Sequence, residues 1–314
     1  MAARATQERT LGAILGLAIG DALGMPVTGL SATQIQESYG VIDTYHARVF
    51  ADGTELKAGE FTDETEISLC VMETYTSANG VLDPELIRAR MQFLARGESR
   101  RWMSAGTLAS LDDDNEPWFR SPATDDPEVA LRGIAIGMIH AAPTIDEAAL
   151  FRDIETVVGL THSSRSVIEQ AALIAVAVAR VLSGRDDQST LIASLIAFSP
   201  SDELTAVLRH VPLGEAVHTG NAAIDVITTA LLAFIQADRF ENAVSSAASA
   251  GGASDSRAAL AGALAGAHFG AGGIPQPLID HLEGRIYLTL AAPWFYRTIQ
   301  LMTGRGLSLG TNGR

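Results

Sequence analysis

Glycine recurs at every fourth position in two segments near opposite ends of the chain. Residues 11–24 read LGAILGLAIGDALG, with glycine at 12, 16, 20 and 24, and residues 251–270 read GGASDSRAALAGALAGAHFG, with glycine at 262, 266 and 270. A spacing of four keeps these residues on one face of an α-helix. Each glycine inside a helix costs about 1 kcal/mol relative to alanine, and close approach of a second backbone is the best compensation. The two segments therefore predict a close-packed central pair of helices.

The remainder of the chain has the same helical character. Of 314 residues, 47% are apolar and only 6% aromatic, so Ala, Leu, Ile and Val build the core. No segment alternates polar and apolar residues, as a strand does, for more than a few positions. Composition does not divide the chain, and the two glycine-rich helices come from its opposite ends. We predict one all-α domain over residues 1–314, with flexible ends at residues 1–6 and about 303–314.

Apolar periodicity, capping residues and helix breakers give the expected element boundaries. Besides a helix within 251–270, helices are predicted at 7–24, 32–39, 63–77, 83–95, 102–111, 127–141, 145–158, 164–182, 189–197, 202–209, 220–236, 240–249 and 278–302. Residues 40–61 and 112–126 lack helical periodicity and are predicted to be loops.

Charge and cysteine content exclude several classes of protein. The chain has 22 basic and 37 acidic residues, a net charge of −15, whereas nucleic-acid binders carry a basic footprint. Cys70 is the single cysteine, which excludes an internal disulfide and fits a reducing cytoplasm. Its apolar neighbours Ile67, Leu69 and Val71 predict a buried structural thiol. We expect a cytoplasmic protein that binds no nucleic acid.

The first apolar segment has a superficial likeness to a secretory signal. Arg4 and Arg9 precede it, as in the charged start of such a signal. However, Asp21 interrupts the run and its glycine spacing matches the later helix, so we predict a core helix instead. The longest other apolar run, Ala171–Ala179, is far shorter than the 18 or more residues of a membrane span. No membrane association is expected.

Two short polar clusters stand at predicted helix starts. The first is Thr62-Asp63-Glu64-Thr65, and the second is Ser254-Asp255-Ser256. Hard divalent cations such as Mg²⁺ prefer oxygen ligands, chiefly carboxylates, carbonyls and water. Plain N-capping is the simpler explanation of each cluster, because Ser, Thr and Asp are the usual caps. Thr62 or Asp63 is expected to serve as the cap of its helix.

Asp21 and His162 are further candidates. Asp21 lies in an apolar helix, where an unpaired carboxylate is costly to bury. It therefore caps a neighbouring element or reaches the same polar site. His162 follows a helix break in Gly-Leu-Thr-His-Ser-Ser, and a loop histidine bonded to backbone is its simplest explanation. The chain has no Ser-His-Asp signature, no Walker loop and no Cys/His zinc spacing.

Taken together, these segments resemble the ADP-ribosylglycohydrolase family over nearly the whole chain. The matching motifs, in the order of the family, are Gly20-Asp21-Ala22-Leu23-Gly24, Phe61-Thr62-Asp63-Glu64-Thr65, Leu160-Thr161-His162, Gly251–Gly270 and Ile274-Pro275. The resemblance implies an orthogonal multi-helix bundle of that type. It also implies a hydrolase acting on an N-glycosidic bond of ribose, in which two Mg²⁺ or Mn²⁺ ions hold the ribose hydroxyls and help water attack the anomeric carbon.

The resemblance also assigns roles to particular residues. It implies that one ion lies among Thr62, Asp63, Glu64 and Asp255, and that Asp255 and Ser256 contribute to a second. Asp63, Glu64 and Asp255 are the expected catalytic carboxylates. The expected substrate-binding residues are Asp21, His162 and Thr28.

The chain departs from the family pattern at several of these positions. Glu64 and Ser256 stand where the family has Asp and Thr, and both changes are mild. Ala253 replaces a metal-binding Asp, and Thr28 replaces a glutamate. The substrate-cradling Ser-Asn-Gly segment is replaced by residues 126–131, DPEVAL. Because two carboxylates are lost, we expect one Mg²⁺ or Mn²⁺ ion rather than two.

Three functions are therefore compatible with the sequence. The first is a glycohydrolase acting on an ADP-ribosylated protein or on a small ADP-ribosyl or ribosyl compound. The second is a catalytically silent relative that binds ADP-ribose or a partner protein. The third is a changed reaction on an NAD-derived or nucleoside-like molecule within a biosynthetic pathway. We expect a monomer or weak dimer in each case.

Overall fold

The computed structural model describes residues 5–112, 119–142, 144–214 and 217–309, without the side chains of 304–309. The α-helices are α1 (Gln7–Gly24), α2 (Ala32–Ser38), α3 (Asp63–Ser77), α4 (Pro84–Arg96), α5 (Ala105–Leu111), α6 (Pro127–Leu131), α7 (Gly133–Ile139), α8 (Glu147–Val158), α9 (Arg165–Leu182), α10 (Leu191–Phe198), α11 (Asp202–Leu208), α12 (Ala222–Gln236), α13 (Phe240–Ser249), α14 (Ser254–Phe269), α15 (Gln276–Asp280) and α16 (Arg285–Leu309). Short 3₁₀ helices are η1 (Met25–Val27), η2 (Glu98–Arg101), η3 (Val211–Leu213) and η4 (Ala271–Gly273). The fold is all-α, as predicted, apart from a hairpin of β1 (Arg48–Val49) and β2 (Glu55–Leu56).

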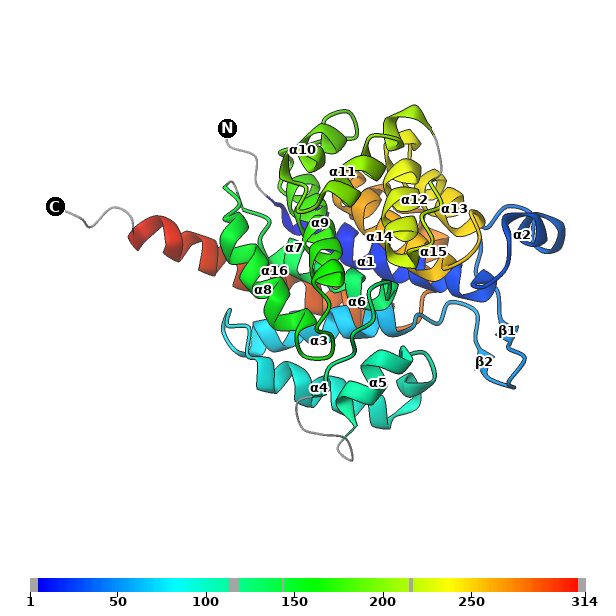
Figure 1. Cartoon of the computed structure of the whole chain (residues 1–314), viewed down its shortest axis with the longest axis horizontal. Helices are drawn as coiled ribbons and strands as arrows, with labels where there is room; N and C mark the ends of the chain where they lie inside the picture. Colours follow the sequence, from blue (N-terminus) through cyan, green and yellow to red (C-terminus); the bar gives the residue numbers. More distant parts are fainter. Residues whose placement is uncertain (1–4, 113–118, 143, 215–216, 310–314) are drawn as a thin grey trace.

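Helices α1 and α14 form the central pair that the glycine spacing predicts (Figure 1). They run antiparallel, with the start of α1 beside the end of α14. A Cβ placed on Gly16 would lie 2.0 Å from the carbonyl oxygen of Gly262, and one on Gly262 would lie 2.0 Å from that of Gly16. The same holds near one end, where a Cβ on Gly24 would lie 2.2 Å from the Ser254 carbonyl oxygen. The backbones touch along this face, which confirms the prediction.

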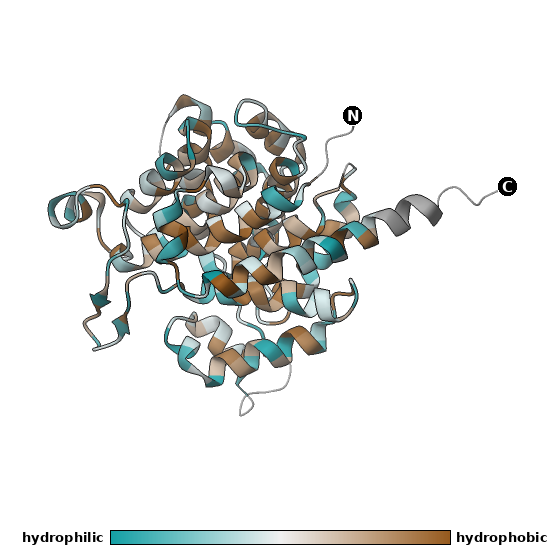
Figure 2. Cartoon of the chain, turned by 180° about the vertical axis from the view of Figure 1, so that it is seen from behind, coloured by the Kyte–Doolittle hydropathy of each residue, from teal (hydrophilic) through white to brown (hydrophobic). Residues whose placement is uncertain are grey.

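The other helices cover this pair. Helices α12, α13 and α9 pack against α14, while α3 and α16 pack against α1. Helix α9 in turn packs against α7 and α8. Apolar residues gather on the inner helices, and hydrophilic residues on the outer turns and the hairpin (Figure 2). The start of α14 and the start of α3 are thereby brought together beside the end of α1.

Three segments differ from prediction in their secondary structure. The predicted loop 40–61 contains the β1–β2 hairpin, in which Arg48 pairs with Leu56. The helix predicted at 127–141 is divided into two helices, α6 and α7. The division lies at Arg132, whose N–H donates to the Val129 carbonyl three residues earlier, as in a 3₁₀ turn. The last predicted helix is also divided, because Gly284, with φ of +63°, separates α15 from α16.

The structure describes parts of both chain ends for which the sequence predicts flexibility. Thr6 caps α1, its hydroxyl accepting the Arg9 N–H at 3.2 Å, and Ala5 is buried. Helix α16 continues to Leu309, beyond its predicted end near 302, and extends away from the body of the molecule (Figure 1). The predicted flexible residues 1–4 and 310–314 lie outside the described residues.

Cys70 of α3 and the apolar segment of α1 were both predicted to be buried in the core. Cys70 is buried, as predicted, and burial raises the pKa of its thiol to about 11. Among the described residues, Gln7–Val27 is the one helical segment that is long and apolar enough to span a membrane. Its apolar window is 94% buried inside the protein, where it forms the core contact with α14.

Candidate functional site

Asp21 holds the start of α3 from the neighbouring helix α1. It is fully buried, and its carboxylate accepts hydrogen bonds from both the N–H and the hydroxyl of Thr62, at 2.8 and 2.7 Å. The hydroxyl and N–H of Thr65 donate to it at 2.6 and 3.3 Å. The first N–H groups of a helix have no partner within the helix, and Asp21 supplies one here. This confirms that Asp21 caps a neighbouring element.

The N-cap residue of α3 is one of the two expected, but its side chain does not make the capping hydrogen bond. Thr62 occupies the N-cap position, but its side chain accepts no capping hydrogen bond from the helix. Its hydroxyl instead lies between two carboxylates, 2.7 Å from Asp21 Oδ1 and 3.0 Å from Glu64 Oε2. A hydroxyl has one proton to donate, so it satisfies only one of these acceptors at a time. The arrangement favours a protonated carboxyl at Asp21 or Glu64.

Helices α3 and α14 bring two of the predicted catalytic carboxylates, the buried Glu64 and the half-buried Asp255, into one cluster. Glu64 Oε1 accepts a hydrogen bond from the Ser256 hydroxyl at 2.8 Å, across 192 positions of sequence. Asp255 Oδ1 accepts one from the Thr28 hydroxyl at 3.0 Å. We call Asp21, Thr28, Thr62, Asp63, Glu64, Asp255 and Ser256 the carboxylate cluster. Every predicted site residue except His162 belongs to it.

The electrostatics of this cluster favour protonated carboxyls or a bound cation. Burial raises the pKa of Asp63, and the neighbouring charges of Glu64 and Glu128 raise it further. Burial likewise raises the pKa of Glu64, with added repulsion from Asp255 and Asp21. For Asp255, burial raises the pKa, while the Ser256 N–H and the Thr28 hydroxyl act to lower it. Ionised carboxylates at this spacing repel one another in a medium of low polarity.

The donor chemistry of this cluster fits a hard divalent cation. Its groups are carboxylates and hydroxyls, which are the oxygen ligands such ions prefer, and a cation would relieve their repulsion. The buried hydroxyl of Ser254, next to Asp255, has no hydrogen-bond partner within the described part of the chain. Among the same residues, no three His, Cys, Asp or Glu side chains already stand in a coordinating arrangement. The ion and its ligands therefore stay a prediction.

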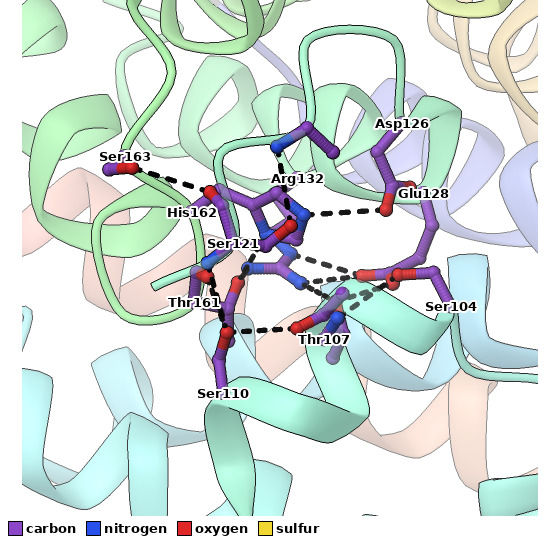
Figure 3. Close-up of polar contacts among 12 residues, drawn as sticks. Ser104, Thr107, Ser110, Ser121, Asp126, Glu128, Arg132, Thr161, His162 and Ser163 are labelled. Atoms are coloured by element: carbon purple, nitrogen blue, oxygen red, sulfur yellow. Dashed lines mark hydrogen bonds and ion pairs between the residues drawn. The ribbon is translucent and has the colours of Figure 1, made fainter. Parts of the chain in front are cut away.

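A second polar cluster surrounds Arg132, between α6 and α7 (Figure 3). Its guanidinium is 1% exposed and donates to Glu128 Oε1 at 2.6 Å. It also donates to the hydroxyls of Thr161 at 2.6 Å and Thr107 at 2.8 Å. The Thr107 hydroxyl in turn donates to Glu128 Oε2 at 2.8 Å. Removing one partner from a buried pair of this kind is strongly destabilising.

His162 lies in this second cluster. The ring is fully buried, with Nδ1 2.9 Å from the Thr161 hydroxyl. Its Nε2 lies 3.4 Å from Asp126 Oδ2, an ion-pair distance without an aligned hydrogen bond to any described residue. Burial acts to raise the pKa of Asp126, but His162 and Ser104 outweigh it and hold that pKa below its usual range. We call Thr107, Asp126, Glu128, Arg132, Thr161 and His162 the arginine cluster.

The two clusters are neighbours. Helix α6, which carries Glu128, packs against both α3 and α14, the helices that carry the predicted catalytic carboxylates. The Glu128 charge contributes to the raised pKa of Asp63. The arginine cluster therefore forms one wall beside the carboxylate cluster, and His162 lies in that wall.

Sequence reasoning missed the centre of the arginine cluster. Arg132 is a basic residue within an apolar, helical stretch, and Glu128 precedes it by one helical turn. Arg132 needs a partner for the same reason as Asp21, because a charge buried among apolar residues is costly unless it is paired. Sequence reasoning also missed Arg257, which follows Asp255 by two residues. Its guanidinium donates to the carbonyls of Gly251 and Ala250.

The buried Asp21 predicts a stability that falls as pH rises. Burial raises the pKa of Asp21 to about 7, above the usual value near 3.9 in an unfolded chain. The folded state thus binds this proton more tightly, and its contribution is lost as pH rises from about 4 to about 7. We expect the melting temperature, measured in EDTA, to fall between pH 5 and pH 7.5. The fall should be smaller in Asp21→Asn, and equal falls in both proteins would contradict the prediction.

The whole chain is similar to known glycohydrolases. An ADP-ribosylarginine hydrolase of Pseudomonas putida is 27% identical over 292 residues, which cover 87% of this chain and 74% of that protein. The ADP-ribosyl-[dinitrogen reductase] glycohydrolase of Rhodospirillum rubrum is 24% identical over 301 residues, which cover 91% and 94% of the two chains.

The fold agrees with these relatives. A solved structure described as an ADP-ribosylglycohydrolase-related protein complex has a TM-score of 0.76 and 26% sequence identity to this chain. The match covers 93% of this chain and 98% of the other. A sequence model of the family described as ADP-ribosylglycohydrolase matches residues 2–305. This chain belongs to the ADP-ribosylglycohydrolase family.

Proposed function

We propose that this protein is a metal-assisted hydrolase that cleaves the N-glycosidic bond of an N-ribosyl group, on an ADP-ribosylated protein or on a small ADP-ribosyl or ribosyl compound. The observation that carries the proposal is the carboxylate cluster. It brings Glu64 of α3 within hydrogen-bond distance of Ser256 of α14, beside Asp63 and Asp255. The relatives from Pseudomonas putida and Rhodospirillum rubrum, named for ADP-ribosyl substrates, support this class of reaction.

The residues that would hold one Mg²⁺ or Mn²⁺ ion are Thr62, Asp63, Glu64, Asp255 and Ser256. Such an ion supplies Lewis-acid polarisation of the ribose hydroxyl oxygens. Burial and neighbouring charges raise the pKa of Asp63 and Glu64. Carboxyl groups with raised pKa exchange protons effectively near neutral pH.

The reaction adds water across the bond from the anomeric carbon to nitrogen. One carboxylate of the Asp63 and Glu64 pair accepts a proton from the attacking water, whose oxygen bonds the anomeric carbon. The bond to nitrogen breaks, and the nitrogen leaves with a proton from solvent or from the other carboxyl. Asp21 has a different role, because its four hydrogen bonds fix the start of α3 and hence the position of this pair.

The test is release of ADP-ribose or ribose from defined substrates. The purified protein is incubated with an ADP-ribosylated protein, ADP-ribosylarginine and N-ribosides, each in Mg²⁺, in Mn²⁺ and in EDTA. We expect release that needs a divalent ion and stops in EDTA. If no substrate is cleaved and neither metal nor ADP-ribose shifts the melting temperature, the proposal is wrong.

A second candidate is a silent relative that binds ADP-ribose or a partner without turnover. The observation that favours it is the contact between Thr28 and Asp255. Thr28 adds a neutral hydroxyl where the family has a carboxylate, and Ala253 adds no side-chain cap or ligand. A shift of the melting temperature by ADP-ribose, without release from any substrate, would favour this candidate.

A further inference from the structure

Helix α16 is apolar on two opposite faces. The inner face packs on α1 and α3, and its buried side chains are Leu288, Ala292, Phe295 and Ile299. The outer face carries five large apolar side chains that are between 47% and 67% exposed, namely Ile286, Tyr287, Leu290, Trp294 and Leu301. A helix that is apolar all round is usually buried. The exposure of the outer face in a single copy of the chain therefore indicates a partner.

The spacing along the outer face is that of a helix that packs on another helix. Five exposed residues follow one another at intervals of three, four, three and four positions, and they are Tyr287, Leu290, Trp294, Arg297 and Leu301. Alternating steps of three and four give the 3.5-residue period of a coiled-coil seam. We call these five residues the outer seam. Its period indicates that the partner is also a helix.

The outer seam is complementary to itself. Leu290 and Leu301 lie at equal distances in sequence on either side of the pair formed by Trp294 and Arg297. If two copies of α16 pack antiparallel about a two-fold axis between Trp294 and Arg297, Leu290 of each copy faces Leu301 of the other. Trp294 of each copy then faces Arg297 of the other. A guanidinium is attracted to the face of an indole ring, so a second copy matches the one charge in the seam.

Charge also favours a second copy at this helix. The chain has a net charge of −15, so two copies repel each other over most of their surfaces. Residues 285–309 contain three arginines and neither Asp nor Glu. The last turns of α16 extend beyond the body of the molecule (Figure 1), which leaves room for a second helix. In an antiparallel pair, this basic end of each α16 lies along the acidic body of the other copy.

The outer face has most of the area that a stable dimer needs. Each of its five large apolar side chains exposes about 100 Å², which together supply over half of the roughly 800 Å² that a stable interface takes from each partner. A groove of about 300 Å³ between α3 and α16 adjoins the seam and adds to this area. Leu69 and Met72 of α3 line the groove, as do Tyr287 and Trp294 of the seam.

We propose that two copies of this chain form a two-fold symmetric dimer through the outer seam of α16, with the two helices antiparallel. In such an interface each contact occurs twice, once from Leu290 to Leu301 and once in the reverse sense. No residue of α16 belongs to the carboxylate cluster or to the arginine cluster. The dimer can therefore be tested whether or not the protein is a hydrolase.

The test is the mass of the full-length protein in solution, measured by analytical ultracentrifugation over a range of concentrations. We expect a particle of twice the mass of the 33.0 kDa chain. Leu290→Glu places a carboxylate in both symmetric contacts and should weaken dimerisation about a hundredfold or more. Leu213→Glu is the matched control, because Leu213 is an exposed leucine of η3, which packs on α11 and α12. This control should dimerise as the native protein does.

A second variant tests the antiparallel arrangement. Leu301→Lys alone should also weaken dimerisation, but an equimolar mixture of Leu290→Glu and Leu301→Lys should restore the dimer. In the mixed dimer the new carboxylate faces the new ammonium group at one contact, and two leucines meet at the other. Both positions are exposed, so each variant should keep the native circular dichroism spectrum.

Three results would overturn the proposal. One is a native protein that stays monomeric over the whole range, including one that instead sediments with phosphatidylglycerol vesicles. Another is a dimer that Leu290→Glu leaves intact, because the interface would then lie elsewhere. The third is a mixture of the two variants that stays monomeric, because the contact between Leu290 and Leu301 would then be wrong.

Discussion

Replacing Gly16 with alanine is expected to destabilise the protein by about 4 kcal/mol or more, or to prevent folding. The added Cβ would lie 2.0 Å from the carbonyl oxygen of Gly262 and 2.7 Å from its carbonyl carbon. Both are backbone atoms of α14, so no side chain can turn away to make room. Relief requires α1 and α14 to separate along the contact that organises the fold.

Helix propensity predicts the opposite sign for this substitution, which makes the measurement decisive. Alanine inside a helix is favoured over glycine by about 1 kcal/mol, so an isolated α1 would gain stability. In a chain of this size, a loss of about 4 kcal/mol lowers the melting temperature by about 10 °C. Gly97→Ala is the control, because its added Cβ would be 3.6 Å from the nearest atom, an ordinary contact. If the Gly16→Ala protein had the same melting temperature as the native protein, the predicted contact between α1 and α14 would be wrong.

The glycine pattern explains why the sequence predicts the centre of the fold so well. Few physical reasons explain a glycine that recurs at every fourth position of a helix. Two helices with the same repeat are therefore expected to pack against each other. The hairpin at 48–56 could not be predicted in this way. Its strands have two residues each, too short for alternation to be visible, and a distant contact from Arg48 to the carbonyl of Pro26 supports it.

The candidate site was predictable in part. Runs of Thr, Asp and Ser at helix starts marked α3 and α14, because these residues suit both caps and ligands. Their pairing, such as Ser256 with Glu64, depends on the antiparallel packing of distant helices, which the local sequence does not contain. Arg132 had a local signal, because it is a basic residue in an apolar, helical stretch. Its partner Thr161 did not, because a threonine beside a helix break has many simpler explanations.

Asp255→Asn is expected to lower kcat about 10³-fold while leaving the fold intact. The asparagine retains an oxygen that can accept the Thr28 hydroxyl, now at 3.0 Å, and removes a carboxylate that the protein holds at a cost. Burial raises the pKa of Asp255, so the folded state disfavours its charge. The melting temperature in EDTA should therefore equal or exceed that of the native protein at pH 7.5.

The same substitution should remove the response to divalent ions. A ligand at about 100 times its dissociation constant stabilises the folded state by about 2.7 kcal/mol, so Mn²⁺ should raise the melting temperature of the native protein and leave Asp255→Asn almost unchanged. Asp43→Asn, at an exposed position, is the control for loss of one charge and should behave as native.

Stability and activity would then change in opposite directions at one residue. A residue that serves only packing cannot give that result, because its loss lowers both stability and activity. A carboxylate that is kept for catalysis destabilises the protein when its site is empty, so its loss lowers activity alone. Retention of more than about a tenth of the activity would exclude Asp255 from catalysis.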